Sequence, residues 1–288
     1  MRGLADYVMS GRWQAVTVAV MFGLIPGLSI VSCAVVALVT LRRGWQDGLQ
    51  ILLWALLPAL LQWMLGDASA VLDLLAVLIG SAVLRQTQSW QRVVALVLLF
   101  GIALQWTLPW QTAYLARVNG AVAALLNNGA ELQIVVEGEV VKPTPAQLVD
   151  ALLHYYGAYQ MLMMFGALLL ARHWQAKLYN PGGFREEFHQ LRIDSRLMLP
   201  VLIAVVAALA GMAPVKDWLF MLCMVPILQG LAVIHKVVAL RKLGSAFLAM
   251  AYLLLMVAAP AYALLGFVDC VADFRKRLAI KTGNDQSS

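Results

Sequence analysis

Long stretches of the chain carry no charged side chain, and their positions predict the architecture. Asp, Glu, Lys, Arg and His are absent from residues 13–41, 48–66, 93–116, 197–215 and 243–268. A helix needs roughly 18 or more apolar residues to cross a hydrocarbon core ~30 Å thick. These apolar runs are continuous, whereas the ~10-residue strands of a membrane β-barrel alternate between apolar and polar residues. The sequence therefore predicts an all-α, polytopic bundle of transmembrane helices.

The gaps between the apolar runs predict about eight or nine membrane segments. We expect them at residues 13–41, 47–65, 68–84, 92–109, 150–172, 196–213, 216–238 and 244–268. Lys and Arg concentrate in every second gap, which the positive-inside rule assigns to the cytoplasm. Residues 1–288 are thus expected to form one multi-pass integral membrane domain, with the lipid bilayer as its main partner.

The first and last segments are each interrupted by proline. If residues 13–41 span once, the N-terminus lies outside. A hairpin at Pro26-Gly27 would instead keep Arg2 and Arg12 inside, as the positive-inside rule prefers, and we favour the hairpin. The last segment either turns back near Pro260 or overrides the same rule at the basic residues 275–277, and the sequence leaves this open.

One exposed segment, residues 117–149, is expected to form a small extracytoplasmic cap. Residues 132–141 carry β-branched side chains on either side of Glu137-Gly138, a pattern that predicts a short hairpin. Thr144 and Pro145 have the residue types of an N-cap and a first helical position. At the other end of the chain, the polar residues 281–288 are expected to be a disordered tail.

A second polar segment, residues 178–196, is expected to form a cytoplasmic amphipathic loop and helix. A turn at residues 180–183 is followed by Phe184, Phe188 and Leu191 at helical spacing. Two interpretations stay open: anchoring on the inner leaflet, or docking of a membrane or cytoplasmic protein partner. The residues that would dock a partner are Asn180, Gly182, Gly183, Phe184, Arg185, Glu186, Glu187 and Phe188.

Composition narrows the functional classes. Hydrophobic residues make up 62% of the chain and charged residues 12%, whereas a soluble domain carries about 25% charged residues. The net charge is +6, and the basic residues lie at the ends of the expected helices. We ascribe them to the topology and to contact with anionic lipids, and we expect no nucleic-acid partner. The chain has no enzyme motif and no Cys/His spacing typical of a metal site. We expect neither catalysis, nor a cofactor, nor a bound metal.

Polar side chains at membrane depth are the candidates for ligand binding, because their burial is costly. They lie at the first helix break, near the outer end of the 68–84 segment, and at the start of the 150–172 segment: Pro26, Ser29, Asp73, His154, Tyr155, Tyr159 and Gln160. A purely structural interpretation is also open, with Asp73 as an interfacial carboxylate and the tyrosines as an aromatic belt. Gln50, Gln62, Gln105 and Gln229 are expected to form interhelical hydrogen bonds.

Three stretches resemble the YybS-like family of predicted bacterial membrane proteins, which is classed as a domain of unknown function. They are residues 1–12, LVTLRRGWQDGL at 38–49 and YNPGGFREEFHQLRI at 179–193. The resemblance covers most of the chain and implies a bacterial cytoplasmic (inner) membrane. A weaker similarity, in the helix break and in Arg-Arg-Gly-x-x-x-Gly at 42–48, is to substrate-binding S components of energy-coupling-factor transporters. AxxxA pairs such as Ala55–Ala59 and Ala204–Ala208 add to it, although S components have typically six helices.

The sequence thus supports two functional hypotheses. The first is a membrane transport component that binds a small molecule, driven by partner subunits. The second is a non-transporting scaffold or regulatory protein that acts through residues 178–196.

Overall fold

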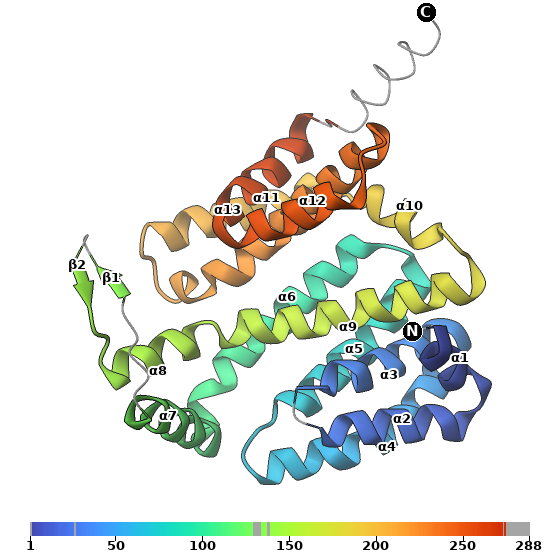
Figure 1. The fold of residues 1–288 in the computed structure, drawn as a ribbon, viewed down its shortest axis with the longest axis horizontal. Coiled ribbons are helices and arrows are strands. Elements are labelled where there is room, and N and C mark those ends of the chain that lie inside the picture. Colours follow the sequence, from blue (N-terminus) through green and yellow to red (C-terminus); the bar gives the residue numbers. More distant parts are fainter. Residues whose placement is uncertain (1, 26, 129–133, 137–138, 273, 275–288) are drawn as a thin grey trace, which may run out of the picture.

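The structure is a computed structural model that describes residues 2–25, 27–128, 134–136, 139–272 and 274. Apart from one short β-hairpin, its regular elements are helices, as the all-α prediction requires (Figure 1). The elements are α1 (Arg2–Ser10), α2 (Arg12–Leu24), α3 (Ser29–Arg43), α4 (Trp45–Met64), α5 (Ser69–Thr87), α6 (Trp90–Thr107), η1 (Leu108–Trp110), α7 (Thr112–Asn127), β1 (Ile134–Val136), β2 (Glu139–Val141), α8 (Pro145–His154), α9 (Tyr156–Tyr179), α10 (Gly183–His189), α11 (Ser195–Leu209), η2 (Val215–Trp218), α12 (Leu219–Leu240) and α13 (Ser245–Ala272).

Among the described residues, five helical stretches are long and apolar enough to cross a membrane. They are Trp45–Met64, Ser69–Thr87, Trp90–Trp110, Val215–Leu240 and Ser245–Ala272. These helices fit an integral membrane protein, but the expected count of eight or nine segments is not confirmed. The other three expected segments differ from the prediction. Residues 13–41 form two helices of 13 and 15 residues, residues 150–172 are divided between α8 and α9, and α11 has only 15 residues.

The first apolar segment is a helical hairpin. The guanidinium of Arg43, at the end of α3, donates to the Met9 carbonyl at 2.8 Å. Arg12, at the start of α2, lies 3.4 Å from the carboxylate of Asp47. A single helix across residues 13–41 would have put Arg12 and Arg43 at opposite ends of the bundle. The chain therefore turns back between α2 and α3, as the favoured interpretation predicted.

Helix α3 forms the centre of the N-terminal bundle. Every residue from Ser32 to Leu41 is buried, and α2, α4, α5 and α9 surround the helix. Within this buried stretch, Thr40 donates its hydroxyl to the Val36 carbonyl at 2.7 Å. A helix that is apolar on all sides is stable only when neighbouring helices enclose it, which explains why this short helix needs no contact with lipid.

The last helix, α13, bends sharply near its middle. Tyr262 donates its hydroxyl to the carbonyl of Ala251 at 2.5 Å, across eleven residues. In an uninterrupted helix, eleven residues advance about 16 Å, which is beyond the reach of a tyrosine side chain. Ala258 has non-helical dihedral angles, two residues before Pro260. The thiol of Cys270, near the end of α13, then approaches the Ile193 carbonyl at 3.4 Å. Of the two alternatives, the structure favours the turn near Pro260.

Helices α11, α12 and α13 form a layer of their own, drawn in orange and red in the upper part of Figure 1. This C-terminal layer packs on α6 and α9 through α12. Within the layer, α12 and α13 approach closely because of two glycines. A Cβ added to Gly266 would lie 1.9 Å from the Pro226 carbonyl oxygen, and one added to Gly230 would lie 2.3 Å from that of Tyr262. Small residues allow such contacts between membrane helices.

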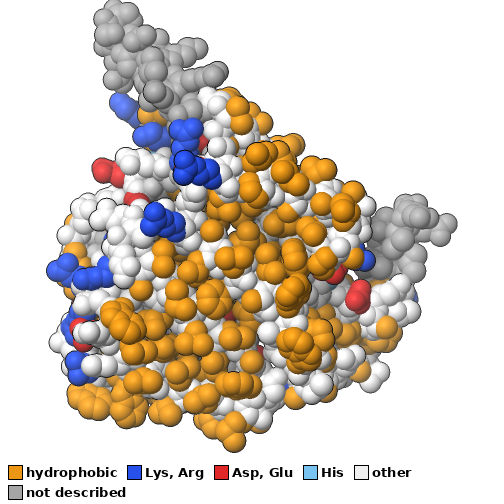
Figure 2. Space-filling model, turned by 180° about the vertical axis from the view of Figure 1, so that it is seen from behind, with side chains coloured by type: hydrophobic (Ala, Val, Ile, Leu, Met, Phe, Trp, Pro, Cys, Tyr) orange, Lys and Arg blue, Asp and Glu red, His pale blue; other side chains and the backbone are white. Residues whose placement is uncertain are grey.

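Basic side chains gather along one edge of the molecule, and hydrophobic side chains cover most of the face between this edge and the opposite end (Figure 2). At the basic end, Arg85 donates to the Leu41 carbonyl at 2.6 Å, and the Arg42 guanidinium lies 4.0 Å from the ring centroid of Tyr179. This arrangement is the one that the alternating charges predicted. We call the basic edge the inner end and the opposite edge the outer end.

The segment expected to form a cap contains α7, β1, β2 and α8. Strands β1 and β2 pair antiparallel, with Val135 opposite Val140, so the predicted hairpin is confirmed. Thr144 caps α8, and Gln147 completes a capping box with it, again as predicted. Helices α7 and α8 contact each other at the outer end (Figure 1). The predicted tail, residues 281–288, lies outside the described residues.

Candidate functional site

Two predicted ligand-binding residues, Asp73 and Gln160, meet in the interior between α5 and α9. The side-chain amide of Gln160 lies 3.5 Å from Asp73 Oδ2, and both side chains are buried. The other carboxylate oxygen, Oδ1, has no hydrogen-bond partner among the described residues. A carboxylate with so little compensation at membrane depth is costly, and so this pair is a site of interest rather than an interfacial anchor.

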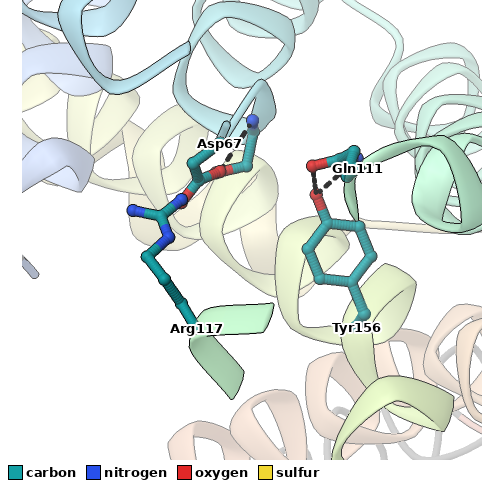
Figure 3. A network of polar contacts seen from close by, with 5 residues as sticks. Asp67, Gln111, Arg117 and Tyr156 are labelled. Atoms are coloured by element: carbon teal, nitrogen blue, oxygen red, sulfur yellow. Dashed lines mark hydrogen bonds and ion pairs between the residues drawn. The ribbon is translucent and has the colours of Figure 1, made fainter. Parts of the chain in front are cut away.

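Two further groups of polar contacts, Asp67 with Arg117 and Gln111 with Tyr156, are drawn in Figure 3. The Asp67 carboxylate accepts hydrogen bonds from the backbone N–H and the hydroxyl of Ser69, at 3.0 and 2.5 Å, and lies 3.8 Å from the Arg117 guanidinium. The hydroxyl of Tyr156 contacts the side-chain amide of Gln111 at 3.3 Å. One helical turn separates Ser69 from Asp73 and Tyr156 from Gln160. Polar groups thus follow α5 and α9 from the outer end down to the buried pair.

The other three residues of the predicted outer cluster, His154, Tyr155 and Tyr159, lie away from Asp73. The ring of Tyr155 packs on Phe220 of α12 with centroids 4.3 Å apart, and His154 contacts the same ring edge-on at 5.8 Å. His154 Nδ1 also lies 3.8 Å from the Asp217 carboxylate. The predicted set therefore divides in two: Gln160 faces the N-terminal bundle, whereas Tyr155 and Tyr159 face the C-terminal layer.

Gln105 of α6 holds these tyrosines in position. Between α8 and α9 the helix is interrupted at Tyr155, which frees backbone groups that need partners. Gln105 donates to the Leu153 carbonyl at 3.1 Å and accepts from the Gly157 N–H at 2.7 Å. The prediction of interhelical bonding is confirmed for Gln105, and also for Gln62, which donates to the Gly23 carbonyl. Gln50 is exposed.

Tyr155 and Tyr159 line a groove of about 840 Å³ between α9 and the C-terminal layer. Apart from the two tyrosines, Cys223 and Met224, its walls are aliphatic or aromatic hydrocarbon. Pro260, at the bend of α13, is part of the lining. The full lining is Tyr155, Ala158, Tyr159 and Leu162 from α9 and its N-cap, Val205 and Leu209 from α11, Leu219, Phe220, Cys223, Met224, Ile227, Leu228 and Leu231 from α12, and Leu255, Ala259, Pro260, Ala263, Leu264 and Phe267 from α13.

The groove opens toward the region that lipid would occupy. Leu162, Leu209 and Leu264 line it and are 52%, 70% and 64% exposed. Ligand sites of a few hundred to about 1,000 Å³ with mainly apolar walls are typical of small-molecule binding. This cavity can therefore take an apolar molecule directly from the membrane, and it offers few hydrogen bonds to a polar one.

The two candidates at the first helix break do not join either site. Pro26 lies outside the described residues. Ser29 begins α3 and is partly exposed at the tip of the hairpin. Helices α3 and α5 run side by side, and Arg85 of α5 contacts Leu41 of α3. Ser29 lies twelve positions before Leu41, and Asp73 lies twelve positions before Arg85, so Ser29 and Asp73 lie at a similar depth. The described residues give no direct contact between them.

The predicted docking segment folds back on the bundle. Glu187 of α10 accepts from Arg172 Nε at 2.8 Å and from Trp90 Nε1 at 2.7 Å. Phe184 and Phe188 pack against the core, whereas Arg185 and Glu186 are exposed. Asn180, Gly182 and Gly183 form the turn before α10, where the positive φ of 93° at Gly182 requires a glycine. A partner would therefore meet the polar face of α10, and the aromatic face is used internally.

Sequence reasoning missed the residues of the groove on α11, α12 and α13, whereas the predicted interhelical bonding of Gln229 is confirmed. Gln229 accepts from the Ile193 N–H at 2.9 Å and donates to the Asp269 carboxylate at 2.9 Å. The sequence cannot distinguish these groove residues, because an apolar residue that lines a groove has the same side-chain chemistry as one that faces lipid. Among the groove residues of α11, α12 and α13, Pro260 alone stands out in the sequence, and it predicts a break in the helix rather than a groove.

Comparisons of the chain with protein-family models, with curated proteins and with solved structures find no match. The YybS-like resemblance thus stays a prediction. Across the part of the chain that the structure describes, no group of three or more His, Cys, Asp or Glu side chains is placed to hold a metal ion.

Proposed function

We propose that this protein is the substrate-binding component of a membrane transport process, and that its groove holds a small hydrophobic molecule. The groove itself is the observation that carries the proposal. It is large enough for a ligand, has apolar walls on both sides, and opens where lipid would be. A hydrophobic molecule would enter from the bilayer without crossing water.

The surrounding architecture supports a ligand that comes and goes. The C-terminal layer contacts the N-terminal bundle mainly through α12, so a small displacement of α11 and α13 would change the width of the groove. The bend at Ala258 and Pro260 lies in the groove wall and supplies a point of flexure. The polar rows on α5 and α9 end at Asp73 and Gln160, and Asp73 would give a partner-driven cycle a buried ionisable group to act on.

Photolabelling in lipid nanodiscs tests the proposal. A diazirine derivative of palmitic acid is titrated into the reconstituted protein, and labelled residues are mapped by mass spectrometry. We expect saturable labelling of groove residues such as Phe220 and Leu264. Labelling of the lipid-facing Leu53 and Leu57 on α4 should instead rise in proportion to the probe.

A pair of variants makes the test specific. Ala158→Phe fills the groove from α9 and should reduce the saturable labelling by at least about fivefold. Ala249→Phe adds the same bulk at an exposed position outside the groove and should leave it unchanged. Non-saturable labelling of the groove, or equal labelling in the two variants, would contradict the proposal.

A further inference from the structure

A second cavity, of about 400 Å³, lies at the inner end between α9, α10, α12 and α13. It contains three of the four histidines of the chain, although they are far apart in the sequence. The lining residues are Leu169, Leu170, His173, Phe184, Arg185, Phe188, His189, His235 and Tyr252. We call this cavity the inner pocket.

The imidazole rings are held by aromatic contacts rather than by a metal-like arrangement. His173 meets the Phe184 ring edge-on with centroids 5.9 Å apart, and His235 meets Phe188 in the same way at 5.1 Å. The rings of His189 and His235 are 6.4 Å apart. His235 Nε2 also lies 2.9 Å from the Tyr252 hydroxyl. The pocket therefore presents several N–H and O–H donors from fixed directions.

The electrostatics of the inner pocket favour an anion. No carboxylate is among its lining residues, and the described residues show no ion pair for Arg185. Of the two acidic residues that follow Arg185 in α10, Glu186 is exposed, and Glu187 is bound to Arg172 and Trp90. Burial, together with Arg185, Lys236 and His235, lowers the pKa of His189 to about 4. Part of this lowering comes from the positive charges of Arg185 and Lys236, which would also attract an anion.

We propose that the inner pocket binds the phosphate group of an anionic ligand at the inner face of the membrane. Arg185 supplies two parallel N–H donors, the geometry that matches a phosphate. His173 and His235 add donors from α9 and α12. This site lies apart from the groove, and it involves a different chemistry from the hydrophobic binding proposed there.

The position of the inner pocket favours a phosphate carried by a lipid. Leu169, Leu170, Phe184 and Phe188 form an apolar wall beside the cationic groups, as a headgroup with a hydrocarbon tail requires. The groove also begins one helical turn away, since Leu231 precedes His235 by four residues on α12 and Leu255 follows Tyr252 by three on α13. A lipid tail could leave the pocket along these helices, whereas a soluble phosphate ester would use only the cationic groups.

Binding measurements on the full-length protein in detergent test this inference and separate the two sources. The probes are dihexanoyl phosphatidic acid, dihexanoyl phosphatidylcholine and glycerol 3-phosphate, and binding is followed by native mass spectrometry and by thermal shift. We expect phosphatidic acid to bind. Weaker binding of glycerol 3-phosphate would identify a lipid source, and equal binding of the two would identify a soluble phosphate ester.

Matched arginine variants decide whether the inner pocket is the site. Arg185→Gln should weaken phosphatidic acid binding by at least about tenfold, because a charge-assisted pair is lost. Arg196→Gln removes an exposed arginine at the same end of the molecule and should leave the affinity within about twofold. The inference is overturned if neither phosphate compound binds, if phosphatidylcholine binds as well as phosphatidic acid, or if both variants weaken binding equally. Thermal unfolding curves of both variants verify that they fold.

Discussion

Trp90 of α6 and Glu187 of α10, 97 residues apart in the sequence, are joined by a hydrogen bond of 2.7 Å from the indole Nε1 to Oε1. The second carboxylate oxygen of Glu187 accepts from Arg172 Nε at 2.8 Å. One side chain thus ties α10 to both α6 and α9. This contact fixes the orientation of the short helix, and with it the aromatic wall of the inner pocket.

Replacement of Glu187 should therefore destabilise the protein. Glu187→Gln keeps the size of the side chain and an oxygen for Trp90, but it removes the charge that pairs with Arg172. We expect the free energy of unfolding to fall by about 1–2 kcal/mol, because a charge-assisted hydrogen bond is lost; partial exposure of the pair to solvent keeps the loss modest. The midpoint of thermal unfolding in detergent, read from tryptophan fluorescence, should fall by a few degrees. The neighbouring, exposed Glu186→Gln is the control, and an equal effect of both changes would contradict the assignment.

The close approach of α12 and α13 should depend on Gly266. An added Cβ would lie 1.9 Å from the Pro226 carbonyl oxygen, which belongs to backbone and cannot move aside. Gly266→Ala should therefore separate the two helices and cost about 1–3 kcal/mol of stability. Gly244→Ala is the matched control, because nothing lies within 4 Å of its added Cβ. A G266A protein as stable as G244A would show that the helices are further apart.

Gln229 should be essential for joining the 178–196 segment to the C-terminal layer. It is fully buried and bonds the Ile193 N–H and the Asp269 carboxylate. Gln229→Leu leaves a buried N–H without its partner, for a cost of about 1–3 kcal/mol. Limited proteolysis should then cleave the chain near residues 190–194 faster than in the unaltered protein. Gln50→Leu, at an exposed position, should not change the rate. Unchanged cleavage in Q229L would argue against this role.

Much of the fold could be predicted because membrane helices leave strong signals. Charge-free runs located the helices, and Arg2 and Arg12 favoured the hairpin. The contacts of Arg12 with Asp47 and of Arg43 with Met9 confirm it. The number of spans could not be predicted, because length and hydropathy do not separate a helix facing lipid from one enclosed by protein, as α3 is. At the candidate sites, spacing along one helix brought out Tyr155 and Tyr159. The contacts between distant helices could not be predicted. The contact of Tyr155 with Phe220 and that of Gln160 with Asp73 depend on how the helices pack, which no local sequence pattern indicates.

Protonation of His189 should make the stability of the protein depend on pH. Its pKa is lowered to about 4 in the folded protein, by burial first and then by Arg185, Lys236 and His235, whereas an unfolded histidine titrates near ~6.5. The unfolded chain therefore binds more protons between these values. The contribution of His189 to stability is complete above about pH 6.5 and is lost as the pH falls toward 4.

A variant comparison isolates this effect from the other titrating groups. His189→Asn cannot take up the proton, so its unfolding midpoint should fall less than that of the unaltered protein between pH 7 and pH 4.5. Arg185→Gln removes one of the cations that lower the pKa and should give an intermediate slope. Both are measured by thermal unfolding at fixed ionic strength. Parallel pH profiles for the unaltered protein and H189N would show that His189 is already protonated or exposed in the folded state. Addition of dihexanoyl phosphatidic acid should also reduce the difference between the two profiles, because a bound phosphate favours the protonated imidazole.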